Sequence, residues 1–302
     1  MPTAEVVKRQ IQTAEDLQSV VRTMKALSAV SMRQYELAVS ALEAYHQTVE
    51  MGLHAVLRDA PYAMDQAGST PNDDLGVLVL GSDQGLCGRF NDQIVDAALA
   101  ALSNLGAEAK RYRIVAIGAR AAARLEEMGQ PVTEALNMPA SLAGVTPMVQ
   151  ELLIHLDGWR STWRLGRVVV FHNRLLSGSV YQPHTVQLFP FYVASRERAA
   201  RRDWPSRSLA MFTMDRELLF SSLLRQHLFV LLYRSLVESL ASENASRLAS
   251  MQAAERSIEE RLDDLRTQFR YQRQHAITEE LLDIVAGFEA SHPRITQTEQ
   301  GA

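Results

Sequence analysis

The last third of the sequence carries a repeat of apolar residues that alternates in steps of three and four. From Arg207 to Ala290 there is no proline, and the only glycine is Gly287. The clearest part of the repeat, broken only by a glutamine, runs through Ile258, Leu262, Leu265, Phe269, Gln272 and Ala276. This pattern predicts a long coiled-coil helix. About eighty residues of helix would extend roughly 120 Å, so the apolar stripe needs a partner.

The N-terminal segment has a matching repeat. No proline or glycine falls between Thr3 and Met51, and Gly52 followed by Pro61 marks the expected end of a helix. Apolar and small residues alternate at Ala14, Leu17, Val21, Met24, Ser28, Ser31, Tyr35, Ala38, Leu42, Tyr45 and Val49. We therefore expect the two ends of the chain to form an antiparallel two-helix coiled coil. Periodicity alone leaves open that both segments are ordinary helices of a compact bundle.

The middle of the chain has a different period. Short β-branched runs at Leu75–Leu80, Ile114–Ile117 and Arg167–His172 are typical of strands covered on both faces. Helical patterns lie between them, at Asn91–Leu105, Ala119–Met128 and Thr146–Asp157, which favours a parallel α/β layer. A last run, Val180–Leu188, is expected to return as an antiparallel edge strand.

The predicted fold is thus α/β plus a long α coiled coil, with a Rossmann-like α/β domain inserted between two helices. The expected segments are an N-terminal coiled-coil helix (1–58), an α/β domain (73–205) and a C-terminal coiled-coil helix (207–290).

Composition narrows the class of protein. The 302 residues are 47% hydrophobic, enough to bury a sizeable core, and the net charge of −4 argues against a general nucleic-acid binder. The single cysteine, Cys87, excludes an internal disulfide and suits a reducing compartment. The opening residues lack the apolar run of a targeting peptide. The most apolar window, Leu218–Leu240, contains charged residues and predicts a buried helix rather than a membrane span.

Candidate chemistry is sparse. The loop Gly81–Asn91, GSDQGLCGRFN, follows a predicted strand and opens a helix, as a phosphate cradle would. Its spacing fits neither of the common nucleotide motifs, so a tight structural turn is favoured. Cys87 fits a small buried thiol better than a nucleophile, and no histidine spacing indicates a metal site. One basic cluster stands out in the sequence and is interpreted as a solvated loop, although contact with an anionic partner or lipid headgroups stays open. It consists of Arg196, Arg198, Arg201, Arg202 and Arg207.

The chain resembles the gamma subunits of F-type rotary ATP synthases in three separated places. The residues that carry the resemblance are Met24, Lys25, Leu27, Ser28, Ala29, Met32 and Arg33; then Ser82, Asp83, Gly85, Leu86, Cys87, Gly88, Phe90 and Asn91; then Ser242, Glu243, Ala245, Arg247, Met251, Arg273, Gln274, Ala276, Ile277, Thr278, Glu280, Asp283 and Gly287. Departures at Ser31, Gln84, Arg89 and Phe288 indicate a divergent branch.

The resemblance implies that the coiled coil is a central shaft within a hexamer of alpha and beta subunits. The α/β domain would be a foot that sits, with an epsilon subunit, on the membrane rotor ring. It implies no bound nucleotide, cofactor or metal, and a peripheral position on the cytoplasmic side of a bacterial inner membrane.

The resemblance also implies roles for particular residues. Met24, Lys25, Arg273, Gln274, Thr278 and Glu280 would contact the hexamer. Asp83, Gly85, Gly88 and Asn91 would form a structural loop of the foot, and the apolar end Leu281–Phe288 would turn in an apolar collar.

Two other classes of protein stay open on the residues alone. One is an enzyme whose α/β domain binds a nucleotide and whose helices dimerise it; the other is a non-catalytic coiled-coil scaffold. The choice of proton or sodium as the coupled ion is not encoded in this chain.

Overall fold

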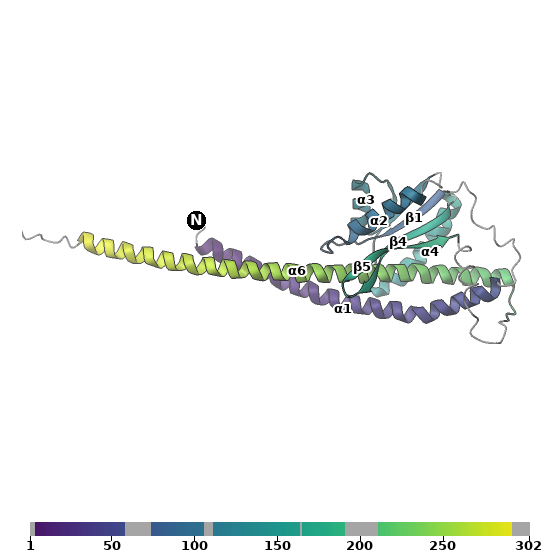
Figure 1. Ribbon diagram of the computed structural model, residues 1–302, viewed down its shortest axis with the longest axis horizontal. Helices are drawn as coiled ribbons and strands as arrows, with labels where there is room; N and C mark the ends of the chain where they lie inside the picture. Colours follow the sequence, from purple (N-terminus) through teal and green to yellow (C-terminus); the bar gives the residue numbers. More distant parts are fainter. Residues whose placement is uncertain (1–3, 58–73, 106–110, 164, 191–210, 292–302) are drawn as a thin grey trace, which may run out of the picture. The chain divides into compact units, whose positions relative to one another are not determined.

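The computed structural model describes residues 4–57, 74–105, 111–163, 165–190 and 211–291 (Figure 1). It divides into two compact units. The first consists of residues 1–24 and 251–302, and the second of residues 25–250. The arginine cluster predicted between Arg196 and Arg207 lies outside the described residues.

The unit of residues 25–250 is built on a five-stranded sheet of order β3-β2-β1-β4-β5. The strands are β1 (Asp74–Leu80), β2 (Tyr112–Ile117), β3 (Val132–Leu136), β4 (Leu165–Ser177) and β5 (Val180–Phe189). The first four pair in parallel, and β5 pairs antiparallel with β4 at the edge. The predicted parallel layer with an antiparallel edge strand is therefore confirmed.

Both faces of the sheet are covered. Alternate residues of β1 point to opposite faces, as the period of a strand requires. Leu75, Val77 and Val79 pack with α2 (Phe90–Leu105) and α3 (Ala119–Glu127).

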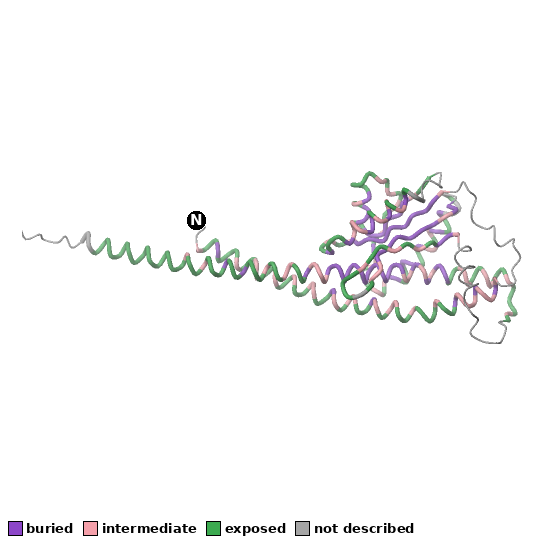
Figure 2. The backbone as a smooth tube through the Cα atoms, viewed as in Figure 1, coloured by how far each residue is buried: buried purple, intermediate pink, exposed green. Residues whose placement is uncertain are grey.

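Leu78 and Leu80 of β1 pack on the other face with α4 (Leu142–Trp163) and with buried residues of α6 (Arg216–Ser291). The long C-terminal helix thus supplies part of the core of the sheet domain. Figure 2 shows this continuous burial in the strands and along the neighbouring part of α6.

Strand β3 was not predicted. Its sequence, Val132–Leu136, alternates half-buried and exposed residues, because it forms the edge of the sheet beyond β2. Five residues with two small or polar side chains exposed carry a weak strand pattern, which is why a search for continuous apolar runs passes over it.

Within residues 25–250, α1 (Ala4–Leu57) runs antiparallel to α6. Glu43 contacts Arg234, while Tyr45, further along α1, donates a hydrogen bond to Gln226, which comes earlier on α6. Helix α1 continues through Gly52 to Leu57, before Pro61. A Cβ at Gly52 would lie 3.1 Å from Leu223 Cδ2, so the glycine allows the two helices to approach closely.

Helix α6 begins at Arg216, later than the predicted Arg207. Asp215 supplies the start signal, because its Oδ1 accepts hydrogen bonds from the backbone N–H groups of Glu217 and Leu218, at 3.0 and 3.1 Å. This is an N-cap, which satisfies donors that have no partner within the helix. Among the described helices, none has a stretch both long enough and apolar enough to cross a membrane.

The other unit, in its described part, is a two-helix coil of α1 up to Met24 and α6 from Met251. Arg22 Nε lies 3.0 Å from Glu255 Oε1, and Arg266 Nη2 lies 2.9 Å from Glu15 Oε1. The two helices therefore run antiparallel here as well. Leu262 and Leu265 are buried, as the repeat predicts. The predicted antiparallel coiled coil is confirmed in place of a compact bundle.

The face of α1 that meets α6 differs in part from the predicted one. Ser28, Tyr35 and Val49 are buried as expected, but Leu17 and Tyr45 are 53% and 44% exposed. At these two places the next residue, Gln18 or His46, is half-buried instead, while the other predicted positions are buried or half-buried. Residues three and four apart share a helix face, so the polar residues Gln18 and His46 fit the same face as the predicted positions on either side of them.

Candidate functional site

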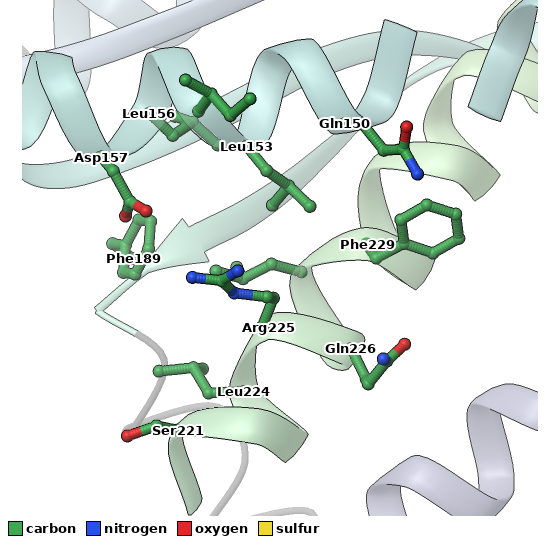
Figure 3. A pocket seen from close by; sticks show the side chains of 12 residues that line it. Gln150, Leu153, Leu156, Asp157, Phe189, Ser221, Leu224, Arg225, Gln226 and Phe229 are labelled. Atoms are coloured by element: carbon green, nitrogen blue, oxygen red, sulfur yellow. The ribbon is translucent and has the colours of Figure 1, made fainter. Parts of the chain in front are cut away.

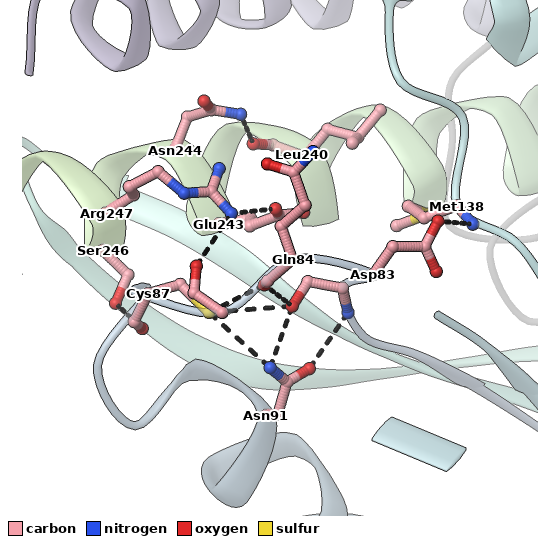
Figure 4. A network of polar contacts seen from close by, with 12 residues as sticks. Asp83, Gln84, Cys87, Asn91, Met138, Leu240, Glu243, Asn244, Ser246 and Arg247 are labelled. Carbon is pink, nitrogen blue, oxygen red and sulfur yellow. Dashed lines mark hydrogen bonds and ion pairs between the residues drawn. The ribbon is translucent and has the colours of Figure 1, made fainter. Parts of the chain in front are cut away.

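The loop that follows β1 is held closed by its own side chains (Figure 4). Asn91 Oδ1 accepts a hydrogen bond from the backbone N–H of Ser82 at 3.0 Å, and Asn91 Nδ2 donates to Ser82 Oγ at 2.9 Å. Ser82 Oγ in turn donates to the carbonyl of Gln84 at 2.8 Å. The predicted loop residue Asn91 therefore fixes the loop from the first turn of α2.

Asp83 ties the loop to two other segments of the sheet domain. Its Oδ1 accepts a hydrogen bond from the backbone N–H of Ala119, the first residue of α3, at 2.9 Å. Its Oδ2 accepts one from the N–H of Met138, in the connection to α4, also at 2.9 Å. A carboxylate at a helix N-terminus is favoured by the helix dipole. Asp83 therefore joins three chain segments at one carboxyl group.

The same loop packs against α6. Ser246 Oγ donates to the carbonyl of Cys87 at 2.6 Å, and Arg247 Nη2 donates to the carbonyl of Gly85 at 3.4 Å. Gly88 has a φ of +56°, and a Cβ there would lie 3.1 Å from Ser250 Oγ. Glycine at this position thus serves both the turn and the close approach of the helix.

Arg247 is held by a buried carboxylate on its own helix. Its Nη2 lies 2.6 Å from Glu243 Oε1, and both side chains are about nine-tenths buried. Burial raises the pKa of Glu243, and the attraction of the Arg247 guanidinium opposes that rise. The pair aims the guanidinium at the loop carbonyl of Gly85.

These contacts favour the structural turn over the phosphate cradle. Loop carbonyls accept bonds from α6, and the backbone N–H of Ser82 is used by Asn91, so the loop's polar groups serve its own fold. Cys87 is buried, with its Sγ 3.6 Å from Ser82 Oγ, and burial raises the pKa of its thiol. A buried thiol with a raised pKa is a poor nucleophile.

A second polar cluster lies between the sheet and the helices and was missed by sequence reasoning. Glu238, buried on α6, accepts a hydrogen bond from Arg234 Nε at 2.8 Å and contacts His172 Nε2 of β4 at 2.8 Å. Burial by itself raises the pKa of Glu238, but the bonds from His172 and Arg234 outweigh it and hold the pKa at about 2. The available signal was the presence of charged residues inside the most apolar window of the sequence.

The predicted contact residues lie on the two long helices. Arg273, Gln274, Thr278 and Glu280 are exposed on α6, in the unit formed by the chain ends. Thr278 Oγ1 donates to the carbonyl of Gln274 at 2.9 Å, within the helix.

Met24 and Lys25 are half-buried on α1, at the boundary between the two units. The structure thus presents the four α6 residues on one open stretch of helix and leaves Met24 and Lys25 against the helix contact.

A groove of about 640 Å³ lies between α4 and the first turns of α6 (Figure 3). Leu153 and Phe229 supply apolar walls, and Asp157 and Arg225 bring opposite charges to it. It is half open, unlike the enclosed apolar pockets that small ligands favour. Among the described residues, no group of three or more histidine, cysteine or carboxylate side chains could hold a metal ion.

Comparison with known proteins connects this geometry to one family. The family model described as ATP synthase matches residues 3–290, nearly the whole chain. The fold resembles a chain of the central stalk and c-ring structure of the Tetrahymena thermophila mitochondrial ATP synthase. That match has a TM-score of 0.56 and 17% identity, and covers 78% of this chain and 99% of that one.

Two chains from Euglena gracilis mitochondrial ATP synthase are also similar. A chain of the rotor structure in rotational state 1 has a TM-score of 0.62 and 13% identity, covering 91% of this chain and 98% of that one. A chain of the OSCP, F1 and c-ring structure in rotational state 3 has a TM-score of 0.66 and 13% identity, covering 99% and 98%. At identities this low, the solved structures support the fold alone, and membership of a family rests on the family model. The family model shows that the chain belongs to the ATP synthase family.

Proposed function

We propose that this chain is the gamma subunit of the complex, a non-catalytic rotor subunit of its central stalk, and that it couples ion flow through a membrane rotor ring to ATP synthesis or hydrolysis in a hexamer of alpha and beta subunits. Its α/β domain would stand on the ring together with an epsilon subunit. The observation that carries the proposal is the antiparallel coil of α1 and α6, whose second helix also packs into the core of the sheet domain. A twist applied to the sheet domain is then applied directly to the coil.

The two helices of the coil differ in length and in sequence, and this difference matters for the mechanism. Different faces of the coil would meet the surrounding subunits at each angle of rotation. A partner shifts a conformational equilibrium only by binding its states with different affinity. An asymmetric coil that turns would therefore stabilise a different conformation in each surrounding subunit in sequence.

We propose contact roles for the exposed polar residues of α6. Arg273, Gln274, Thr278 and Glu280 would form hydrogen bonds to the hexamer that break and form again at each step. A guanidinium and a carboxylate make the stronger, charge-assisted bonds. Met24 and Lys25 would meet the hexamer from α1. In the same proposal, Asp83, Gly85, Gly88 and Asn91 are structural, because they hold the loop that joins the foot to α6.

We further propose the segment boundaries 1–58, 73–205 and 207–290 for the first helix, the foot and the second helix.

The expected location is peripheral, on the cytoplasmic face of a bacterial inner membrane. Washing membranes at low ionic strength tests it: the chain should leave the membrane with the hexamer, and retention of the chain after such a wash would contradict a peripheral position.

The contact roles are tested in the reconstituted complex by the double substitution Arg273→Ala and Gln274→Ala. Both side chains are exposed, so assembly and stability should be unchanged. Loss of a charged hydrogen bond, about 1.5–3 kcal/mol, should lower the ratio of ATP-driven ion pumping to ATP hydrolysis by roughly half or more.

The matched control is Arg261→Ala, an exposed arginine earlier on the same helix, which should leave the ratio unchanged. An unaltered ratio in the double variant would remove Arg273 and Gln274 from the mechanism.

A further inference from the structure

One set of charged side chains joins three elements of the unit of residues 25–250. We call it the Glu238 cluster: His172 and Arg174 on β4, Arg234 and Glu238 on α6, and Glu43 on α1. Glu238 contacts His172 at 2.8 Å, Arg234 at 2.8 Å and Arg174 at 3.6 Å. Arg234 extends the chain of contacts to Glu43 at 3.2 Å. Glu238 thus contacts the sheet directly and is linked to α1 through Arg234.

The cluster runs from the dry interior to the surface. The side chain of His172 is 1% exposed and that of Glu238 is 8% exposed, whereas Arg234 and Glu43 are 26% and 48% exposed. The ring of His184 on β5 packs edge-on against His172, with ring centroids 5.4 Å apart. The inner end of the cluster is therefore shielded from water, where the strength and direction of an ion pair are preserved.

Stability alone does not account for a charged group at this place. Moving a carboxylate out of water is costly, and apolar residues of similar size often replace a buried ion pair without loss of stability. The surrounding residues of α6, such as Leu236, Val237 and Leu240, are apolar and already fill the contact with the sheet. The hydrophobic effect has no preferred direction, whereas hydrogen bonds and ion pairs are directional and so restrict further how far the helix is turned or shifted.

We propose that Glu238 is a positioning residue for torque transfer, which locks the sheet, α6 and α1 in one register so that they turn as a single body. This inference rests on the proposed coupling function. A second polar contact beside it supports the assignment: Ser242 Oγ, one turn further along α6, lies 3.0 Å from the carbonyl of Asn173 on β4 and 2.8 Å from the carbonyl of Glu238 on its own helix, and its hydroxyl proton is shared between the two. Hydrogen bonds and ion pairs from the same face of α6 therefore set its rotation against β4.

The decisive variant removes the ion pair and keeps the volume, with Arg234→Met and Glu238→Met together. Its thermal midpoint and assembly should stay close to those of the wild type. Under an opposing ion gradient, its ratio of pumping to ATP hydrolysis should fall about twofold or more, since the helix can slip against the sheet. Glu238→Gln, which keeps an acceptor for Arg234 and a polar partner for His172, should restore most of the ratio.

Three outcomes separate the possibilities. A double variant with normal stability and full coupling overturns the proposal. If that variant does not fold, Glu43→Ala takes its place, because Glu43 is half exposed and its loss removes the ion pair between α1 and Arg234 of α6, together with an exposed contact to Gln47 within α1; full coupling in that variant under load also overturns the proposal. If the wild-type complex itself fails to pump ions on ATP hydrolysis, the coupling function fails instead, and the two failures are distinguishable.

Discussion

Buried polar residues of this chain are arranged by their partners, and Glu238 is the clearest case. Burial opposes its charge, yet hydrogen bonds from His172 and Arg234 lower its pKa to about 2 from an ordinary value of 4.5. A carboxyl group whose pKa is lower in the folded state stabilises the fold above pH 4.5. That contribution is lost as the pH falls from about 4.5 toward 2. Burial lowers the pKa of His184 below 6.5, so protonation of this ring opposes folding at a higher pH than protonation of Glu238 does.

Glu238→Gln should therefore flatten the dependence of stability on pH in the acid range. The amide does not titrate, so the wild type should lose about 2 kcal/mol more than the variant in free energy of unfolding between pH 5.5 and 3. Urea unfolding at a series of pH values measures this difference. Glu260→Gln, an exposed substitution on the same helix, is the control and should follow the wild-type profile. Parallel profiles for Glu238→Gln and the wild type would show that the carboxyl pKa is not lowered.

At the scale of elements, close approach of backbones decides where glycine is required. Gly81 ends β1 beside α3, and a Cβ there would lie 2.2 Å from Ala121 Cβ and 2.8 Å from Asn91 Oδ1. Ala121 Cβ cannot move without moving α3, and the Asn91 side chain cannot turn away without breaking its hydrogen bonds to Ser82. Gly158 lies inside α4, and a Cβ there would meet no heavy atom within 4 Å. The same residue type thus has opposite meanings at the two positions.

The substitution Gly81→Ala should lower the free energy of unfolding by about 1–3 kcal/mol or more, because it overpacks the contact of β1 with α3. Gly158→Ala, the matched control, should raise it by about 0.5–1 kcal/mol, since alanine favours a helix interior. Chemical denaturation of both variants gives the two signs. A neutral Gly81→Ala variant would mean that α3 is free to shift away from the strand.

At the scale of the whole molecule, α6 carries apolar residues past the end of its contact with α1. In the unit of the chain ends, Leu262 is 3% exposed, but further along the helix Leu281 and Ile284 are 58% and 63% exposed. Exposed apolar side chains at regular helical spacing mark a surface for partners or for self-association. We interpret this stretch as the part of the helix that the hexamer would cover.

Replacing Leu281 and Ile284 by glutamine should therefore reduce self-association of the isolated chain, as measured by light scattering. Its thermal midpoint should not change, because both side chains are already in water. Leu262→Gln, the same change at a buried position, should instead cost about 2–5 kcal/mol of stability. If the double variant were as destabilised as Leu262→Gln, the exposed stretch would be packed within the chain.

Much of the element order could be predicted, and the misses have physical causes. Four of the five strands, and the helices between them, could be predicted from the period of the apolar residues and from β-branched composition. The edge strand Val132–Leu136 could not, because it lacks the continuous apolar run of a buried strand. The loop at Asp83 and Asn91 was located by sequence, while its attachment to Ser246 and Arg247 was not. Those residues are more than a hundred and fifty positions away in the chain.

The sequence by itself determined that the two chain ends are helices with facing repeats and that an α/β sheet lies between them, because period and strand composition are local properties. Only the tertiary structure decided that Gln18 and His46 are half-buried where Leu17 and Tyr45 were expected, since neighbours three and four residues apart satisfy the same periodicity. It also decided that Glu238 contacts His172 and Arg234, and that Gly52 lies close to Leu223. Such contacts join residues through space, and no local pattern encodes them.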